Sequence, residues 1–314
     1  MGTRKIQQLL TYKVCNMDGS KIRGIICAIL TPFTRNGKNI DHDKLHKLVD
    51  FLLEKGCHGL FVGGTTGEGL ILSLEERKEL LESVLKVAGK KCMVIAHTGT
   101  FDLRSTIELT AHAVEKKAFA VGIVTPGYYY YDEEALFQYY STIAKEFPRF
   151  PILLYNIPSC ARNFLSNTLI LRLAKKHPNI VGVKDSTGNM VNLSELLTSK
   201  PVGFAVINGV DEYGYQAFLA GVQGAVSGTA NVAPEFYLGV YENCMKRRLP
   251  EAWIYQTQLT KLCQILQYGR NLGLFKYALK LRGIDTGYVR PPHREPTALE
   301  KKEIEKHLKQ LNLI

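Results

Sequence analysis

The sequence predicts a (β/α)8 barrel, and two patterns along its 314 residues support this fold class. Short apolar runs rich in β-branched residues alternate with longer amphipathic runs, and the alternation repeats about eight times. An unbroken order of strand, helix and strand requires parallel pairing and right-handed crossovers. Eight such units in about 210 residues fit one closed barrel better than an open sheet with a second domain. The expected strands are Gly24 to Phe33, Gly59 to Gly64, Cys92 to Gly99, Ala120 to Pro126, Pro151 to Pro158, Ile180 to Ser186, Gly203 to Val210 and Gly224 to Asn231.

Helical spacing of apolar residues predicts the segments between these strands. The pattern is clearest after the first two strands, where the apolar positions are Leu45, Leu48, Val49, Leu52 and Leu53, and then Leu74, Leu80, Leu81 and Val84.

The chain after the eighth strand predicts additional helices. Pro234 to Leu266 and Leu272 to Leu281 are helical in pattern, and a proline-rich turn over 289–296 precedes a final helix. We therefore expect an N-terminal extension over residues 1–21, the barrel over 22–232, and a helical annex over 233–314 that packs as part of the same domain.

Composition excludes several classes of protein. With 46% hydrophobic and 22% charged residues the chain can bury a large core, and no apolar run reaches the roughly 20 residues of a membrane span. The net charge of +11 comes from Lys and Arg interspersed with acidic residues, so we expect no nucleic-acid or membrane partner. The seven cysteines are scattered without a C-x-x-C motif, which favours a reducing, cytoplasmic location. Positive potential would favour small anionic substrates such as 2-oxo acids.

Lys184 is unusual because it interrupts the β-branched run from Asn179 to Ser186. An ammonium in an apolar strand loses hydration, which favours the neutral amine, and neutral amines attack carbonyl groups. The alternative is a lysine at the strand end that extends to solvent or pairs with Asp185.

Other polar residues follow the expected strands at the end where barrel enzymes hold their active sites. The loop Gly63-Gly-Thr-Thr-Gly-Glu-Gly69 can present hydroxyls and amides to an anion, but it lacks the lysine of a P-loop. Its alternative role is a tight turn with a threonine cap. Tyr155 ends the fifth strand and could carry protons, or it could be a core tyrosine. Tyr128 opens a run of four tyrosines, some of which we expect at a subunit interface.

Four motifs together resemble the dihydrodipicolinate synthase/N-acetylneuraminate lyase family of class I aldolases. They are Gly64-Thr-Thr-Gly-Glu68, Val124-Thr-Pro-Gly-Tyr128, Tyr155-Asn-Ile-Pro158 and Val181-Gly-Val-Lys-Asp-Ser186, and they occur in the family's order. The resemblance runs from about Ile22 to the C-terminus. It implies a (β/α)8 barrel with a helical annex, a homotetramer, a Schiff base with pyruvate or another 2-oxo acid, and no metal or cofactor.

The resemblance also implies roles for individual residues. Lys184 matches the Schiff-base lysine and Tyr155 the tyrosine that shuttles protons. Thr65 and Tyr128 match the rest of the hydroxyl relay, with Tyr128 expected to reach a neighbouring subunit's site. For substrate binding, Thr66 matches the residue that grips the pyruvate carboxylate, and Val226 matches the position whose backbone carbonyl contacts the keto acid. Gly64, in the same motif as Thr66, is expected to let the backbone approach the ligand.

The sequence departs from the family's synthases where these carry an arginine for the second substrate. Cys160 stands there, and a thiol cannot replace a bidentate guanidinium. Arg162 could substitute if the loop bends.

Gly209-Val-Asp-Glu212 resembles the acidic pair with which neuraminate lyases bind substrate hydroxyls, although Asp211 and Glu212 could instead cap the next helix. Ser227 begins a strand-eight motif that occurs both in synthases and in sugar-acid aldolases. We therefore expect an aldolase or lyase for a 2-keto-3-deoxy sugar acid or sialic acid. The alternatives are a 4-hydroxy-tetrahydrodipicolinate synthase, which condenses pyruvate with aspartate semialdehyde, and a non-catalytic pyruvate-binding homologue.

The eight histidines show no metal-ligand spacing. His97 alone is expected inside the barrel, as a core residue with its hydrogen bonds satisfied.

Overall fold

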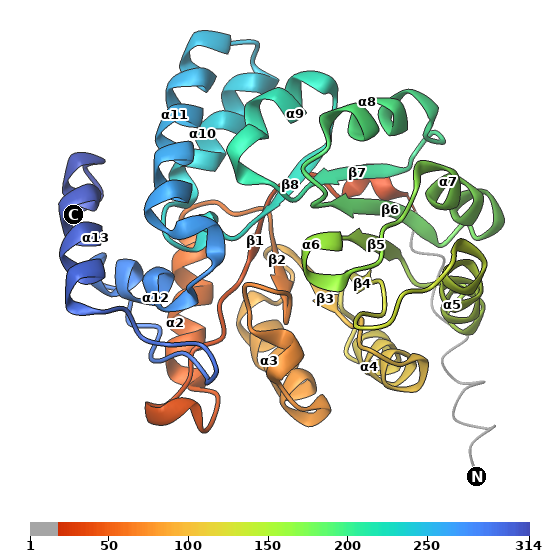
Figure 1. The fold of residues 1–314 in the computed structure, drawn as a ribbon, viewed down its shortest axis with the longest axis horizontal. Helices are drawn as coiled ribbons and strands as arrows, with labels where there is room; N and C mark the ends of the chain where they lie inside the picture. Colours follow the sequence, from red (N-terminus) through yellow and green to blue (C-terminus); the bar gives the residue numbers. More distant parts are fainter. Residues whose placement is uncertain (1–17) are drawn as a thin grey trace.

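The computed structural model describes residues 18–314, and their centre is a closed barrel of eight parallel strands (Figure 1). The strands follow one another in sequence order, and β8 pairs with β1 to close the barrel. The predicted fold class is therefore confirmed. The N-terminal extension expected over 1–21 lies mostly outside the described residues. The strands are β1 Gly24–Ala28, β2 Gly59–Val62, β3 Met93–His97, β4 Ala120–Val124, β5 Ile152–Asn156, β6 Ile180–Asp185, β7 Ala205–Asn208 and β8 Gly224–Ser227.

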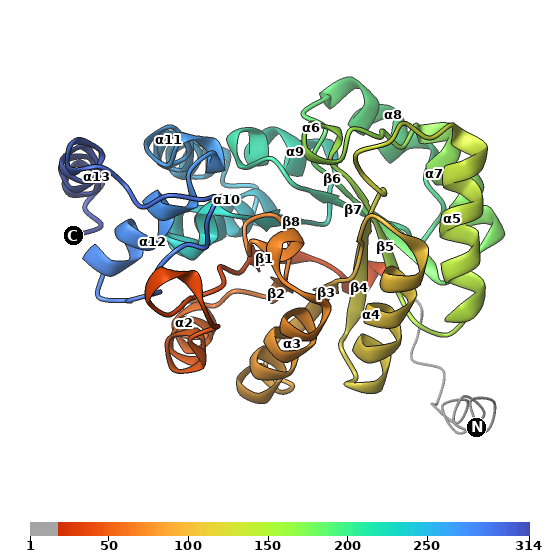
Figure 2. The same cartoon turned by 60° about the horizontal axis from the view of Figure 1, so that its bottom comes forward.

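Helices follow the strands and surround the barrel (Figures 1 and 2). Their N-termini carry the side-chain caps that free backbone N–H groups need: Asp41 caps the first helix, and Ser73 and Glu76 form a capping box on the next. These helices are α2 His42–Glu54, α3 Leu74–Ala88, α4 Leu103–Glu115, α5 Glu133–Glu146, α6 Pro158–Ala161, α7 Asn167–Lys176, α8 Met190–Ser199 and α9 Gly214–Ala220.

The strand register places the two most reactive predicted residues side by side. Tyr155 on β5 pairs with Lys184 on β6, and residues paired in this way point their side chains to the same face of a sheet. Tyr155 belongs to an apolar cluster inside the barrel, separate from the larger cluster between strands and helices. The interior cluster also contains Phe61 and Val226. The barrel interior is thus filled by side chains, and the site lies at the carboxyl ends of the strands.

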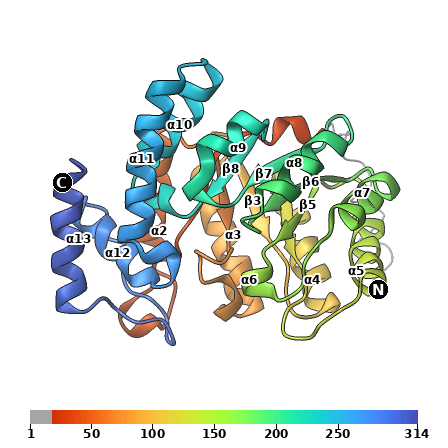
Figure 3. The ribbon, with the colours of Figure 1, turned by 45° about the horizontal axis from the view of Figure 1, so that its top comes forward.

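The chain after β8 forms four helices that lie together on one side of the barrel (Figures 1 and 3). The single helical stretch expected from Pro234 to Leu266 is two helices, because the chain turns between them at Arg247, whose φ is 59°. The four helices are α10 Pro234–Met245, α11 Leu249–Ile265, α12 Leu272–Leu281 and α13 Ala298–Gln310. The boundaries that we assign to the barrel and the annex stay predictions.

Within residues 18–314, every helix is too short or too polar to cross a lipid bilayer.

Candidate active site

Lys184 is buried, with only 5% of its surface exposed. Its Nζ lies over two aromatic rings, 3.9 Å from the ring centroid of Tyr155 and 4.6 Å from that of Phe61. Asp185 does not pair with it, because Asp185 Oδ1 accepts hydrogen bonds from the backbone and hydroxyl of Thr187 at 2.8 and 2.7 Å. Lys184 therefore neither extends to solvent nor pairs with its neighbour, and the structural alternative considered for it is wrong.

Tyr155 brings a hydroxyl next to this amine. Its ring packs edge-on against Phe61 and His97, with centroid distances of 5.8 Å to each. Its hydroxyl lies 3.4 Å from Thr65 Oγ1, at the long end of the hydrogen-bond range. The loop after β2 and strands β5 and β6 thus bring Thr65, Tyr155 and Lys184 together, as their motifs predict.

Phe61 is a member of the site that sequence reasoning missed. Its ring fills the barrel interior between Gly64 and Gly122, where an added Cβ would lie 2.8 and 2.5 Å from the ring carbons. Only glycine can stand at either position without displacing the ring. Gly64 is therefore buried against Phe61, and it shapes the floor below Lys184 as well as the loop.

Thr66 lies against the end of β8. A Cβ added at Gly228, the residue after β8, would lie 3.1 Å from Thr66 Oγ1. The glycine therefore allows the Thr66 hydroxyl to lie close to the backbone at the end of β8. Thr66 is half-buried and Val226 is buried in the barrel interior. Their predicted contacts with a keto acid stay predictions.

The side chains of Asp211 and Ser227 are both buried and are hydrogen-bonded to each other. Asp211 Oδ2 accepts hydrogen bonds from Ser227 Oγ at 2.8 Å, and from Thr229 Oγ1 and N at 2.6 and 3.1 Å. Burial raises the pKa of Asp211, while the hydrogen bonds from Thr229 and Ser227 oppose this rise. The carboxylate therefore fixes the turn after β8 and does not cap the following helix. Asp211 Oδ1 is buried and has no hydrogen-bond partner in the structure. Binding of substrate hydroxyls by Asp211 stays a prediction.

Glu212 is half-buried, and burial raises the pKa of its carboxyl. Cys160 and Arg162 are both exposed, at and just after the short helix α6. Arg162 adopts a φ of 65°, so the loop does bend at this residue. A bend there is the condition under which Arg162 could replace the arginine of the synthases.

Tyr128 does not join the other hydroxyls within its own chain. Its side chain is 77% exposed, and its ring packs edge-on against Tyr129 with a centroid distance of 5.0 Å. The loop that carries it is fixed by buried Asn163, whose Nδ2 donates to the carbonyls of Pro126 and Tyr129 at 2.7 and 2.8 Å. Sequence reasoning missed Asn163, because only the folded chain brings residues 37 positions apart together.

His97 is buried inside the barrel, as predicted, but only one of its ring nitrogens is satisfied. Nδ1 lies 3.0 Å from the carbonyl of Gly63 and 3.0 Å from an Arg77 guanidinium nitrogen, whereas Nε2 has no hydrogen-bond partner in the structure. Burial, with Arg77 and Lys184 nearby, lowers the pKa of His97 well below its ordinary value. A neutral imidazole therefore stands beside Tyr155.

Among the residues described, no three His, Cys, Asp or Glu side chains gather in a way that could hold a metal ion. The six cysteines of this part of the chain are free thiols.

Comparison with known proteins places this geometry in context. The dihydrodipicolinate synthetase family matches residues 21–311. An uncharacterized DapA-like lyase of Thermococcus onnurineus is 35% identical over 92% of this chain and 98% of its own. A 4-hydroxy-tetrahydrodipicolinate synthase of Methanopyrus kandleri is 34% identical over 94% and 98%, and an N-acetylneuraminate lyase of Rhizobium meliloti is 30% identical over 88% and 90%.

The fold is also similar to that of solved structures. The crystal structure of YagE, a prophage protein of E. coli K12 in complex with pyruvate, superposes with a TM-score of 0.88 at 29% identity, covering 93% of this chain and 99% of that one.

Proposed function

The chain belongs to the dihydrodipicolinate synthetase family of carbon–carbon lyases, and we propose that its Lys184 forms a Schiff base with pyruvate or another 2-oxo acid. One observation carries the proposal: a buried amine lies 3.9 Å from the ring centroid of a tyrosine whose hydroxyl lies 3.4 Å from a second hydroxyl. An amine that lies over aromatic rings, without a carboxylate partner, is placed to act as a nucleophile.

The reaction follows from these groups. The Nζ of Lys184 attacks the C2 carbonyl of the keto acid, and the resulting carbinolamine loses water to give an iminium ion. The iminium draws electrons from the neighbouring carbon, so that a C–H or C–C bond breaks to an enamine. The enamine carbon then forms the new bond to an aldehyde, and hydrolysis frees the lysine; cleavage runs through the same steps in reverse.

These steps take up or release protons, and Tyr155 is the group that we assign to transfer them. A phenol in contact with a second hydroxyl can give a proton to the leaving hydroxide and take it back. Thr65 continues the relay, and Tyr128 of a neighbouring subunit is its proposed third member. Hydroxyl groups avoid a fixed negative charge beside the carbonyl that the amine attacks.

The keto-acid carboxylate would lie over the loop after β2. Thr66 supplies a half-buried hydroxyl there, and Gly64 lets the backbone approach. The Val226 backbone carbonyl is the proposed contact on the strand-eight side. These three assignments come from the family resemblance.

For the second substrate we propose a polyhydroxylated aldehyde, released from a 2-keto-3-deoxy sugar acid or a sialic acid. Exposed Cys160 supports this choice because it offers no charge to a carboxylate, and half-buried Glu212 can accept hydrogen bonds from hydroxyl groups. The bend at Arg162 favours the alternative, condensation of pyruvate with aspartate semialdehyde, because it could bring a guanidinium to the site. Comparing kcat/KM for the two reactions separates them, and we expect the sugar acid to lead by about tenfold or more.

The assembly that we propose is a homotetramer in which Tyr128 crosses a subunit interface. A tyrosine side chain left 77% exposed in a single chain is available for such a contact. The cytoplasmic location stays a prediction.

Borohydride trapping tests the central proposal. Reduction in the presence of pyruvate should convert the imine to a secondary amine on Lys184, detected by mass spectrometry, and Lys184→Ala should carry no adduct. A label on another lysine of the wild-type protein would contradict the assignment. An adduct on Lys184 without turnover of any aldehyde would favour a non-catalytic homologue.

A further inference from the structure

The loop that carries Thr65 and Thr66 is bound to the helical annex through a buried ion pair. Glu68 and Lys276 on α12 are both buried, and the Nζ of Lys276 lies 2.9 Å from Glu68 Oε1. The other oxygen, Oε2, accepts a hydrogen bond from the backbone N–H of Arg290 at 2.9 Å. Both oxygens of this carboxylate are thus held by residues more than 200 positions away in the sequence.

The partners of this ion pair extend the connection. Lys276 also donates to the backbone carbonyls of Thr31, at 2.7 Å, and Tyr288. Thr31 in turn donates from its hydroxyl to the carbonyl of Gly67 at 2.6 Å. Two consecutive loop residues, Gly67 and Glu68, are therefore fixed from the annex side.

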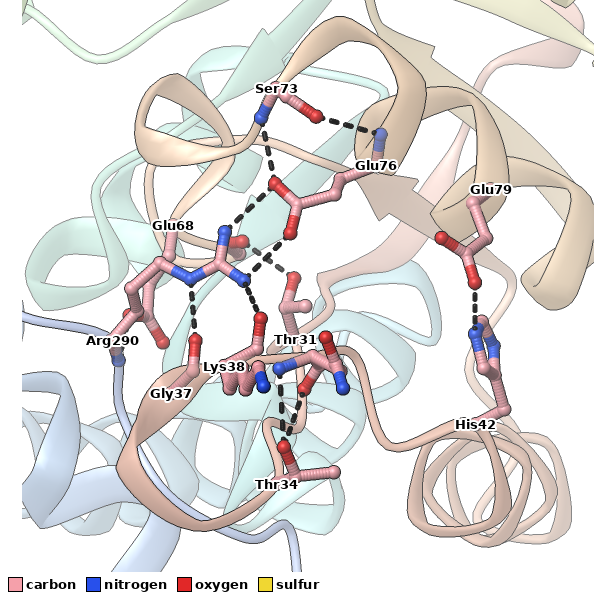
Figure 4. A network of polar contacts seen from close by, with 12 residues as sticks. Thr31, Thr34, Gly37, Lys38, His42, Glu68, Ser73, Glu76, Glu79 and Arg290 are labelled. Carbon is pink, nitrogen blue, oxygen red and sulfur yellow. Dashed lines mark hydrogen bonds and ion pairs between the residues drawn. The ribbon is translucent and has the colours of Figure 1, made fainter.

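A second ion pair holds the annex segment in place (Figure 4). The Arg290 guanidinium binds both oxygens of Glu76 at 2.7 and 2.8 Å and donates to the carbonyls of Gly37 and Lys38 at 2.8 and 3.1 Å. A guanidinium that binds a carboxylate through two hydrogen bonds is fixed in orientation as well as in distance. The backbone N–H of Arg290, which donates to Glu68, therefore has a defined position.

Inside the loop, backbone bonds relate Glu68 rigidly to the hydroxyl residues. The N–H of Glu68 donates to the carbonyl of Thr65 at 3.1 Å, and the N–H of Gly69 donates to that of Gly64 at 3.0 Å. Glu68 itself has a φ of 58°, which a non-glycine residue keeps only when its surroundings hold it. Displacing the Glu68 carboxylate would therefore move Thr65.

We propose that Glu68 and Lys276 are positioning residues that hold Thr65 within hydrogen-bond reach of Tyr155. The inference rests on the proposed function, and it makes the annex part of the catalytic geometry. The distance from Thr65 Oγ1 to the Tyr155 hydroxyl is already 3.4 Å, so a small outward shift breaks the contact. Misplacing a reacting group by about 1 Å can lower a rate by about a hundredfold.

Glu68→Gln tests the proposal, because an amide has one acceptor oxygen for the two donors, Lys276 Nζ and Arg290 N–H. The readout is exchange of the pyruvate methyl protons in D2O, followed by NMR, alongside borohydride trapping. We expect exchange at saturating pyruvate to fall by about tenfold or more, while Lys184 is trapped to the same final extent as in the wild type.

Glu235→Gln is the matched control. Glu235 on α10 accepts from Arg282, the residue after α12, at 2.5 Å through its Oε1. This ion pair also involves the α12 region, but its hydrogen bonds go to Val232 and Glu235 and not to the Thr65 loop. This variant should keep exchange within about twofold of the wild type even if its melting temperature falls. Exchange in Glu68→Gln as fast as in this control would overturn the proposal.

Thr31→Val decides the question if Glu68→Gln does not fold, since it removes only the 2.6 Å bond to Gly67 and buries no lone charge. A fall of about threefold or more in exchange supports the proposal, and wild-type exchange overturns it. A wild type that shows neither exchange nor trapping would overturn the proposed function and the inference together. A wild type that exchanges beside an equally active Glu68→Gln overturns the inference alone.

Discussion

Tyr155 has a packing role and a proposed chemical one, and substitution can separate the two. In Tyr155→Phe the ring keeps its edge-on contacts with Phe61 and His97, so the variant should fold normally. Without the hydroxyl the relay to Thr65 is broken, and kcat should fall by about 10² or more. Turnover assays with circular dichroism as the folding control check this. A near-normal kcat would remove Tyr155 from the mechanism.

His97 makes stability depend on pH. The pKa of His97 in the folded state is well below its ordinary value. At a pH below about 6.5, His97 therefore binds a proton in the unfolded chain but stays neutral in the folded one. Stability is therefore fully present above that pH and falls as the pH drops, by up to about 1.4 kcal/mol per pH unit.

His97→Gln cannot take up this proton. We expect the free energy of unfolding of the wild type to fall more steeply than that of the variant between about pH 6.5 and 5.5, as measured by urea denaturation. Parallel slopes would show that His97 is protonated as easily in the folded chain as in the unfolded one.

The positions of single residues relative to one another could be predicted where a residue's place on or just after its strand determined its surroundings. Lys184 and Tyr155 stand near the carboxyl ends of their strands and Thr65 in the loop that follows β2, and parallel strands share that edge, so the three come together. The partners of Asp211 and Glu68 could not be predicted in the same way. Their hydrogen bonds depend on side-chain directions and on contacts between segments far apart in the chain.

At the scale of elements, the sequence located all eight strands but extended each of them too far. Strand β1 was expected to continue to Phe33 and β8 to Asn231, whereas they end at Ala28 and Ser227. The side chain of Asn231, which follows β8, binds the backbone at the end of β1. It accepts from the N–H of Leu30 at 3.0 Å and donates to the carbonyl of Ala28 at 2.7 Å. These side-chain hydrogen bonds stand in place of strand-to-strand backbone bonds. The spacing of apolar residues does not predict such a replacement.

Asn231→Ala should consequently cost stability. Asn231 is fully buried, and its loss leaves a buried N–H and a carbonyl without partners, for an expected cost of about 2–4 kcal/mol. Asn243→Ala is the control, because it removes one local helix bond to Gly239 and should change stability by less than about 0.5 kcal/mol. Thermal or urea unfolding measures both. Equal effects would mean that Asn231 does not hold the junction of β1 and β8.

At the scale of the whole molecule, the alternation of eight units was enough to predict the barrel, because few topologies accept such a pattern. The break between α10 and α11 was missed because apolar residues continue on both sides of the turn at Arg247, although Pro250 in the first turn of α11 is a signal for a helix start.

Mixing inactive subunits tests the assembly. If Tyr128 serves a neighbouring site, Tyr128→Phe and Lys184→Ala subunits should regain part of the wild-type activity when refolded together, because some hybrid sites then contain both residues. Native mass spectrometry confirms that mixed oligomers have formed. Mixed oligomers without recovered activity would place Tyr128 in its own subunit's site or outside the mechanism.

The Phe61 ring, wedged between Gly64 and Gly122 with Lys184 Nζ over it, sets the depth of the site. If the substrate is bound to that amine, as we propose, the ring blocks it from below, and a longer substrate must extend toward the loops that follow the strands. Variation in substrate size can therefore be accommodated only on the side of the loops. On the proposed mechanism, changes in the loops would alter which aldehyde is accepted, while the activated carbon atom would stay at a constant distance from the Phe61 ring.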